Sequence, residues 1–385
     1  MPPLPLLAEY PMQRSISMSP SLSLGQRIIR QRLIGRVLLL VIAVLAATRL
    51  VQGLIDSPTL FLQQIVNGIQ LGFVYALIAL GYTMVYGIVR LINFAHGDVF
   101  MVGAFVSFFA VSRYRLHLWL VNLAPGMSPD LALLIGAITV ILLSMAVCAL
   151  LAVTIERIAY KPLRNAPRIS ALITAIGVSF FLEYFGALPF VFSPNFITNE
   201  RPFPVVTWYI NNGLHQLQAG ESVPAGSVTF SNIAIIIVLA SLLLLILLQF
   251  IVHRTKIGKA MRAVAYDKPT ARLMGINVDG IISITFAIGA ALAGAAGVLY
   301  AIAFTQVFFA MGILPGLKAF VAAVLGGIGS IPGALVGALI MGQAEVLSAG
   351  YISTPMRDAI AFTILILVLL VRPTGIFGEA EREKA

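Results

Sequence analysis

Long apolar runs separated by short polar loops dominate this sequence. A helix that crosses the hydrocarbon core of a bilayer needs about 20 apolar residues, and most of the runs approach or exceed that length. The candidate spans are 34–55, 60–88, 97–112, 131–154, 169–192, 232–252, 280–305, 317–348 and 358–371. The pattern therefore predicts an all-α polytopic membrane protein with about 8–9 transmembrane helices.

The apolar stretch 317–348 is too long for one simple span, and glycine and proline interrupt it. Residues 326–333 read Gly-Gly-Ile-Gly-Ser-Ile-Pro-Gly. Glycine permits unusual φ angles, and Pro332 cannot continue the hydrogen-bond ladder of a helix. If 280–305 and 358–371 cross in opposite directions, the stretch between them must leave and return on one side. We therefore predict a broken or re-entrant hairpin here, which a membrane tolerates when it is buried in protein or lines a cavity.

The distribution of basic residues orients the predicted helices. The loops 155–168 and 253–279 are rich in Lys and Arg, whereas the long loop 193–231 has Arg201 as its only basic residue. Because cytoplasmic loops carry the excess of Lys and Arg, the first two loops are expected inside and the third outside. Both termini then fall in the cytoplasm. A short basic loop near Arg113 is the one exception, since it falls outside.

Composition agrees with a lipid environment. Of the 385 residues, 59% are hydrophobic and 10% are charged, whereas a soluble domain has about 25% charged residues. The net charge of +10 lies largely in loops, so it indicates membrane topology rather than nucleic-acid binding. Cys148 is the only cysteine, which excludes a disulfide framework or a thiolate metal cluster. Residues 1–33, rich in Pro and Ser and then basic, are expected to form a disordered cytoplasmic tail.

Motifs for catalysis are absent from the sequence. It contains no G-x-x-x-x-G-K-[ST] phosphate loop, no H-E-x-x-H and no G-x-S-x-G, and its four histidines are scattered. A membrane enzyme is therefore disfavoured. We expect a non-catalytic subunit with no metal site and no cofactor of its own.

Polar residues inside the spans are candidates for a translocation path. Gln63, Asn67 and Gln70 recur at i, i+4 and i+7, which places them on one helical face. Such a face either lines a path for a polar solute or bonds to a neighbouring helix. The candidate path residues are Gln63, Asn67, Gln70, Tyr82, Asn93, His96, Gly97, Asp98, Glu183, Gly326, Gly327 and Gly329.

Acidic residues well inside the spans are expected at Asp98 and Glu183. Glu183 either contacts a cationic group of a substrate or forms a hydrogen-bonded carboxyl against a neighbouring helix, and the second interpretation is favoured. So few acidic groups argue against a stand-alone ion-coupled carrier or channel, because such carriers usually keep ionisable groups in the membrane.

The basic loop 253–279 contains signals for a short helix. Asp267 is a good N-cap, Pro269 is tolerated in a first turn, and Gly275 is suited to the position after the helix. The helix would expose Leu273 and Met274 at its end. Exposed apolar groups on a short helix suit docking into the groove of a partner, although they would also suit a helix lying on lipid headgroups.

Several stretches of the chain resemble the LivH-type permease subunit of branched-chain amino-acid ABC importers. The matching stretches are Ala76 to Ile88 (ALIALGYTMVYGI), Ile92 to Asp98 (INFAHGD), Leu273 to Asn277 (LMGIN), Lys318 to Phe320 (KAF), Leu325 to Gly337 (LGGIGSIPGALVG) and Arg372 to Gly378 (RPTGIFG). They occur in the family's order, and the resemblance as a whole covers about residues 59–378. The segment 34–55 is then an extra N-terminal transmembrane helix, and 379–385 is a cytoplasmic tail.

The resemblance implies a division of labour. It implies a second homologous permease subunit, two cytoplasmic ATPases that hold ATP and Mg, and a periplasmic amino-acid-binding protein, all at a bacterial inner membrane. The implied substrates are leucine, isoleucine and valine, and a urea or short-amide permease of the same family is the alternative. The resemblance also places coupling to the ATPase at Gly258, Arg262, Asp267, Pro269, Ala271, Arg272, Leu273, Met274 and Gly275.

Overall fold

The computed structural model describes residues 47–378 except 124–125, 165, 219 and 373, together with positions 37, 40, 41 and 44. The predicted tails 1–33 and 379–385 lie outside the described residues, as does much of the predicted helix 34–55. Residues 47–56 form a helix, and Ser57 separates it from the next helix.

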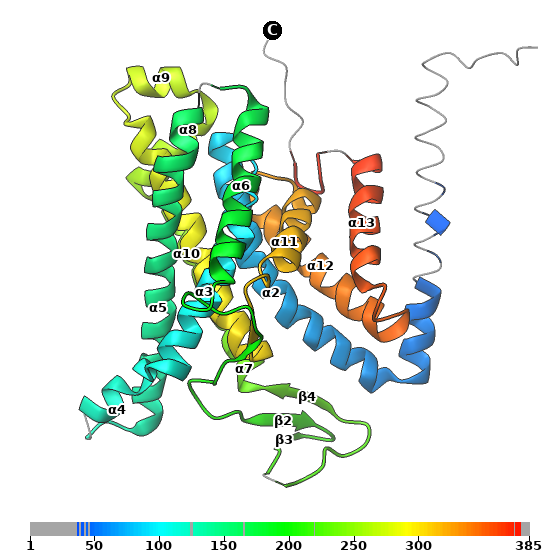
Figure 1. The fold of residues 1–385 in the computed structure, drawn as a ribbon. Coiled ribbons are helices and arrows are strands. Elements are labelled where there is room, and N and C mark those ends of the chain that lie inside the picture. The colour runs from blue at the N-terminus through cyan, green and yellow to red at the C-terminus, as the bar shows by residue number, and fades with distance from the viewer. Residues whose placement is uncertain are drawn as a thin grey trace, which may run out of the picture.

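Helices make up the body of the protein (Figure 1). The long ones are α2 (Pro58–Val89), α3 (His96–Phe108), α5 (Pro129–Ile155), α6 (Arg168–Gly186), α7 (Asn232–Arg254), α10 (Val278–Phe304) and α12 (Ile331–Tyr351). Shorter ones are α4 (Trp119–Leu123), α8 (Lys256–Tyr266), α9 (Lys268–Leu273), α11 (Ile313–Gly326) and α13 (Arg357–Val371). Single turns of π-helix (Phe109–Arg113 and Glu156–Tyr160) and 3₁₀-helix (Leu116–Leu118 and Lys161–Leu163) extend α3 and α5.

The expected all-α membrane fold is confirmed. Within the described part of the chain, six helices are long and apolar enough to cross a membrane, and a seventh span results if 96–113 and 116–123, bent by 60°, count as one. The short helix α13 and the partly described N-terminal helix account for the difference from the sequence-based count, and the predicted stretch 317–348 is divided between α11 and α12. The predicted span 169–192 ends as a helix at Gly186, since Pro189 disfavours helical geometry in the residue before it.

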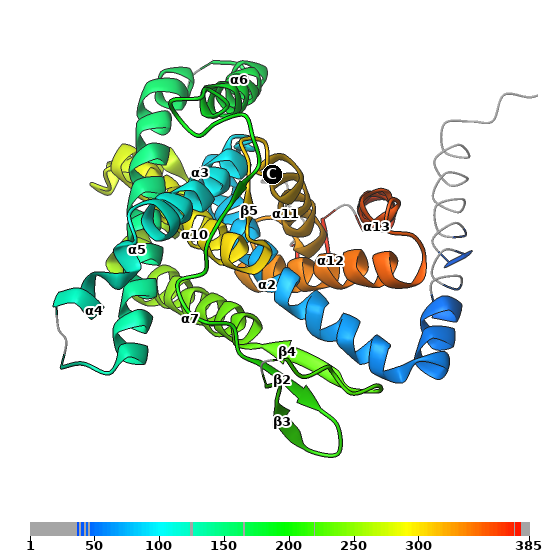
Figure 2. The same cartoon turned by 60° about the horizontal axis from the view of Figure 1, so that its bottom comes forward.

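The helices α2 and α10 form the centre of the molecule, and α5, α6, α7 and α13 lie around them (Figure 2). In the most apolar 18-residue stretch of each helix, 83% of the residues are buried in α2 and 72% in α10, against 22% in α5 and in α7. Glycines bring backbones together in this centre. A Cβ on Gly103 would lie only 2.7 Å from Cα of Gly294. Because glycine has no Cβ, α3 and α10 can pack closely here, as membrane helices do at small residues.

The helices α11 and α12 form the predicted hairpin. Gly327 and Gly329 have φ angles of 103° and 100°, and the Ser330 side chain caps α12 by accepting a hydrogen bond from the backbone N–H of Gly333 at 3.2 Å. The segment after α13 covers the turn, because the N–H groups of Ile376 and Phe377 donate to the carbonyl oxygens of Leu325 and Gly326, each at 2.9 Å. The start of the glycine break is therefore buried, at Gly326 and Gly327, whereas Gly329 is exposed.

Short strands, which the sequence pattern did not predict, lie at the opposite end of the molecule from α9 (Figure 1). The strands β2 (Thr207–Ile210), β3 (Leu214–Gln216) and β4 (Val228–Ser231) form an antiparallel sheet in the order β3-β2-β4. A second pair joins β1 (Ile197–Thr198) to β5 (Gln306–Val307). These strands give structure to the loop 193–231.

Candidate coupling arm and translocation site

The helices α8 and α9, together called the arm, project from one end of the molecule. The predicted short helix is present as α9, and its start is capped as expected. Asp267 Oδ1 accepts from the backbone N–H of Thr270 at 3.1 Å, and Asp267 Oδ2 accepts from the Thr270 hydroxyl at 2.8 Å. Gly275, just after the helix, has a φ angle of 81°, a conformation that glycine adopts without strain.

The sequence did not predict α8, the part of the arm that packs against α7. Arg262 of α8 donates to the carbonyl oxygen of Val252 in α7. Gly258 lies so close to α7 that a Cβ there would overlap the same oxygen. Met261 and Val264, three residues apart, are buried on the same face. That spacing was a readable signal for a helix within the basic loop.

The residues assigned to coupling divide into anchors and surface. Ala271 is buried, like Gly258 on α8, whereas Leu273 is 88% exposed and Met274 is 78% exposed. Burial lowers the pKa of Lys268, and the positive charges of Arg164 and Arg90 lower it further. The arm thus presents two apolar side chains beside a group of cations, a surface that suits an apolar groove with acidic neighbours.

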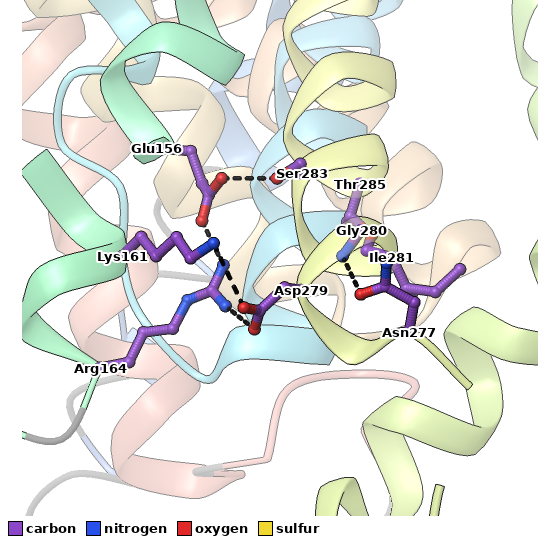
Figure 3. A network of polar contacts seen from close by, with 9 residues as sticks. All are labelled: Glu156, Lys161, Arg164, Asn277, Asp279, Gly280, Ile281, Ser283 and Thr285. Carbon is purple, nitrogen blue, oxygen red and sulfur yellow. Dashed lines mark hydrogen bonds and ion pairs between the residues drawn. The ribbon is translucent and has the colours of Figure 1, made fainter. Parts of the chain in front are cut away.

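A network of ion pairs ties the base of the arm to the segment that follows α5 (Figure 3). Arg164 bonds both to Glu156 and to Asp279, which lies in the first turn of α10. The buried Glu156 also accepts from the Ser283 hydroxyl at 2.6 Å, and Lys161 Nζ lies 3.3 Å from Asp279 Oδ2. Since α10 begins at Val278, shortly after α9 ends at Leu273, these contacts join the start of the helix that follows the arm to the end of α5.

The polar break 93–98 is packed inside the protein. The Tyr160 hydroxyl donates to Asn93 Oδ1 at 2.7 Å, and the ring of Tyr82 stands edge-on to that of His96 with centroids 4.7 Å apart. A Cβ on Gly97 would lie 2.5 Å from the carbonyl oxygen of Gly312. These positions are set by close packing between helices.

Asp98 and Glu183 come together between α3 and α6. Both side chains are buried, and the Ser179 hydroxyl, one turn before Glu183 on α6, donates to Asp98 Oδ2 at 2.5 Å. Glu183 is therefore buried on the face of α6 that meets α3, and its role as a substrate contact or as a structural carboxyl stays a prediction.

The predicted polar stripe on α2 divides between two environments. Gln63 joins the strands: its amide donates to the Thr229 carbonyl at 2.9 Å and accepts from the Thr229 N–H at 2.7 Å. Asn67 and Gln70 instead line a cavity of about 390 Å³ whose wall also includes Glu345 of α12. Gly326, Gly327 and Gly329 are not brought to this cavity, since they form the hairpin turn.

A buried ion cluster beside this cavity was missed by the sequence analysis. Lys318 Nζ lies 2.6 Å from Glu345 Oε1 and 2.7 Å from Asp358 Oδ1, and the Tyr75 hydroxyl donates to Glu345 Oε2 at 2.8 Å. The expectation that Asp98 and Glu183 are the acidic residues deep in the spans was therefore incomplete. The missed signal was an ionisable residue within the apolar stretch 317–348, which by default marks a functional position.

Comparison with known proteins places these features in a family. The family described as "Branched-chain amino acid transport system / permease component" matches residues 64–369. The chain belongs to this family of permeases. A high-affinity branched-chain amino acid transport system permease protein, LivH of Escherichia coli (strain K12), is 44% identical over 324 residues, which cover 84% of this chain and 97% of the relative. No solved structure matches.

Two further relatives show how far the similarity extends. The permease protein BraD of Pseudomonas aeruginosa is 41% identical over 324 residues, covering 84% of this chain and 98% of that protein. A probable LivH of Methanocaldococcus jannaschii is 27% identical over 312 residues, covering 78% and 88%. The family match begins in α2 and ends in α13, so the arm, the hairpin and the ion cluster of this permease all lie within it.

Proposed function

We propose that this permease is the transmembrane subunit of an ATP-driven importer that moves leucine, isoleucine and valine into the cytoplasm. The 44% identity to the E. coli permease over 97% of that protein carries the proposal, because that relative is a high-affinity branched-chain amino acid transport system permease. The exposed apolar tip of the arm supports an ATP-driven mechanism, since it offers a docking point for a separate motor.

The proposed assembly has four kinds of component. A second homologous permease subunit completes the path, two cytoplasmic ATPases bind ATP and Mg, and a periplasmic protein delivers the amino acid. The sparsely buried helices α5, α6 and α7 leave surface for lipid and for the second permease. Leucine, isoleucine and valine differ by little more than a methylene, which changes binding in an apolar pocket by about 1–3 kcal/mol, so the periplasmic protein is the better place for discrimination.

The orientation follows from the loop charges. The arm and the segment after α13 face the cytoplasm, together with the N-terminus, and the three-stranded sheet faces the periplasm of a bacterial inner membrane. In this orientation the arm meets the ATPase, and the sheet lies where a binding protein would arrive.

Uptake of labelled leucine, compared with labelled urea, tests the substrate. The permease and its partner subunits are produced in bacterial cells that lack their own systems for both solutes. We expect ATP-dependent leucine uptake and no urea uptake, whereas urea uptake without leucine uptake would favour the short-amide alternative. Reconstitution of this chain alone is the control for a stand-alone carrier, and flux without ATPases would contradict the importer.

A further inference from the structure

The cavity beside α2 has the size and the lining of a site for a small zwitterion. Its volume of about 390 Å³ falls within the range of small-molecule sites, about 300–1,000 Å³. Its lining combines amide and charged side chains with apolar ones such as Val74, Phe304 and Val346. A ligand with charges at one end and a branched aliphatic group at the other would satisfy both kinds of side chain.

Arg357 is the group in this cavity with spare hydrogen-bonding capacity. Its side chain is 46% exposed, and its Nε lies 3.7 Å from Glu345 Oε1 and 3.6 Å from Asp358 Oδ1. These distances are longer than hydrogen bonds, and the guanidinium makes no hydrogen bond to another described residue. A guanidinium presents a planar fork of donors that matches a carboxylate.

The short contacts of Glu345 are made by residues other than Arg357. Both oxygens of Glu345 are occupied by hydrogen bonds, one from Lys318 at 2.6 Å and one from Tyr75 at 2.8 Å. Lys318 is 4% exposed and also pairs with Asp358. Lys318 therefore makes the short contacts to both acidic groups, and Arg357 keeps only long ion pairs to them. The donors of its guanidinium that no described residue uses can bind an anionic group from the cavity.

The opposite charge of a zwitterion also has a place here. Gln70 lines the cavity, and its side-chain amide makes no hydrogen bond within the described residues, so its oxygen can accept from an ammonium group. Glu345 adds a fixed negative charge on the same wall. The cavity thus offers acceptors for an ammonium group at Gln70 and Glu345 and donors for a carboxylate at Arg357, the two charged groups of an α-amino acid.

We propose that this cavity is a transient binding site for the transported amino acid, in which Arg357 holds the carboxylate, Gln70 and Glu345 face the ammonium, and the apolar wall contacts the aliphatic side chain. This inference rests on the proposed function as an amino-acid importer. It assigns the permease its own contact with the charged end of the substrate, separate from selection by the binding protein.

Ligand binding to the purified permease complex in nanodiscs, without the periplasmic protein, tests this site. The probes are L-leucine, leucinol, which lacks the carboxylate, and 4-methylpentanoate, which lacks the ammonium. Loss of a charge-assisted hydrogen bond costs about 1.5–3 kcal/mol, so we expect Arg357→Gln to weaken leucine binding about 10- to 100-fold. Leucinol should bind weakly to the unaltered complex, and Arg357→Gln should leave its affinity unchanged.

Two further variants keep the test decisive. Arg372→Gln at the other end of α13 removes an exposed charge outside the cavity and should leave leucine affinity unchanged. Ala349→Trp fills the cavity without removing a charge and should weaken leucine binding about 10-fold or more, so it serves if Arg357→Gln does not fold. Unchanged leucine affinity in the folded cavity variants would overturn the site.

Leucine uptake by the same complexes in vesicles separates the two proposals. If the unaltered complex imports leucine while the cavity variants bind and import it equally well, the site is wrong and the importer stands. If the unaltered complex imports no leucine, both proposals fail. Equal affinity for leucine and 4-methylpentanoate would show an anion site rather than a zwitterion site and would also overturn the inference.

Discussion

The arm and the ion cluster around Glu345 both depend on charged residues, but they use charge in opposite ways. In the arm, cations and two exposed apolar side chains form a surface, and the helix is fixed by caps from residues a few positions away. In the cluster, Lys318, Glu345 and Tyr75 come from three helices and are buried together. The comparison teaches that the exposed site is specified locally, whereas the buried one exists only when the whole bundle has packed.

Removal of the buried lysine should have the largest effect on stability. Lys318→Met leaves Glu345 and Asp358 without their closest cation, and breaking a buried ion pair costs about 3–5 kcal/mol. Lys259→Met on the exposed side of α8 is the matched control, since surface substitutions usually change the free energy of unfolding by about 0.5 kcal/mol or less. Thermal unfolding of the purified permease measures both, and equal midpoints for the two variants would contradict the structural role of the cluster.

A change at the tip of the arm should affect docking but not folding. The double substitution of Leu273 and Met274 to Ser removes side chains that are 88% and 78% exposed. Loss of a central apolar contact weakens an interface by about 2 kcal/mol, or about 30-fold. The measurement is the affinity of a labelled ATPase subunit for the permease in nanodiscs.

The control for this docking experiment is Leu214→Ser, which removes an exposed leucine from β3 at the other end of the molecule. It should leave the affinity for the ATPase unchanged. If the tip variant also binds as tightly as the unaltered permease, the arm is not the docking point, and a helix lying on lipid headgroups becomes the better interpretation.

Loss of the cap of α9 should have the smallest effect. Asp267→Ala removes the acceptor for the Thr270 N–H and costs about 1 kcal/mol. Amide hydrogen exchange at Thr270 should become about 5-fold faster, with exchange in α2 unaltered. Asp267→Asn preserves a cap and should stay close to the original rate, and equal acceleration in both variants would show that the cap does not hold the helix.

Local signals explain which parts of the fold were predictable. The starts and ends of the apolar runs gave the helices to within a few residues, and Asp267, Pro269 and Gly275 gave α9 because caps and turns depend on neighbouring residues. The glycine-rich break predicted the hairpin between α11 and α12 for the same reason. The strands of 207–231 were missed, since runs of three or four residues are too short to show a period.

The candidate site was harder to predict because its contacts are long-range. Glu345 meets Tyr75 across 270 residues and Lys318 across 27, and no local pattern indicates which helix faces which. The polar stripe on α2 shows the same limit: Gln63 bonds to strand β4, whereas Asn67 and Gln70 line the cavity. Packing partners, rather than periodicity, decide what each polar side chain does.

The separation between Lys318 and Glu345 also has a consequence for the synthesis of the chain. The lysine leaves the ribosome 27 residues before the glutamate, which at about 5–20 residues per second is a delay of about 1–5 seconds. A lone lysine at the centre of a membrane helix costs about 2.5–3.5 kcal/mol. During that interval α11 has no counter-ion, so its stable place in the bilayer depends on the arrival of α12 and α13.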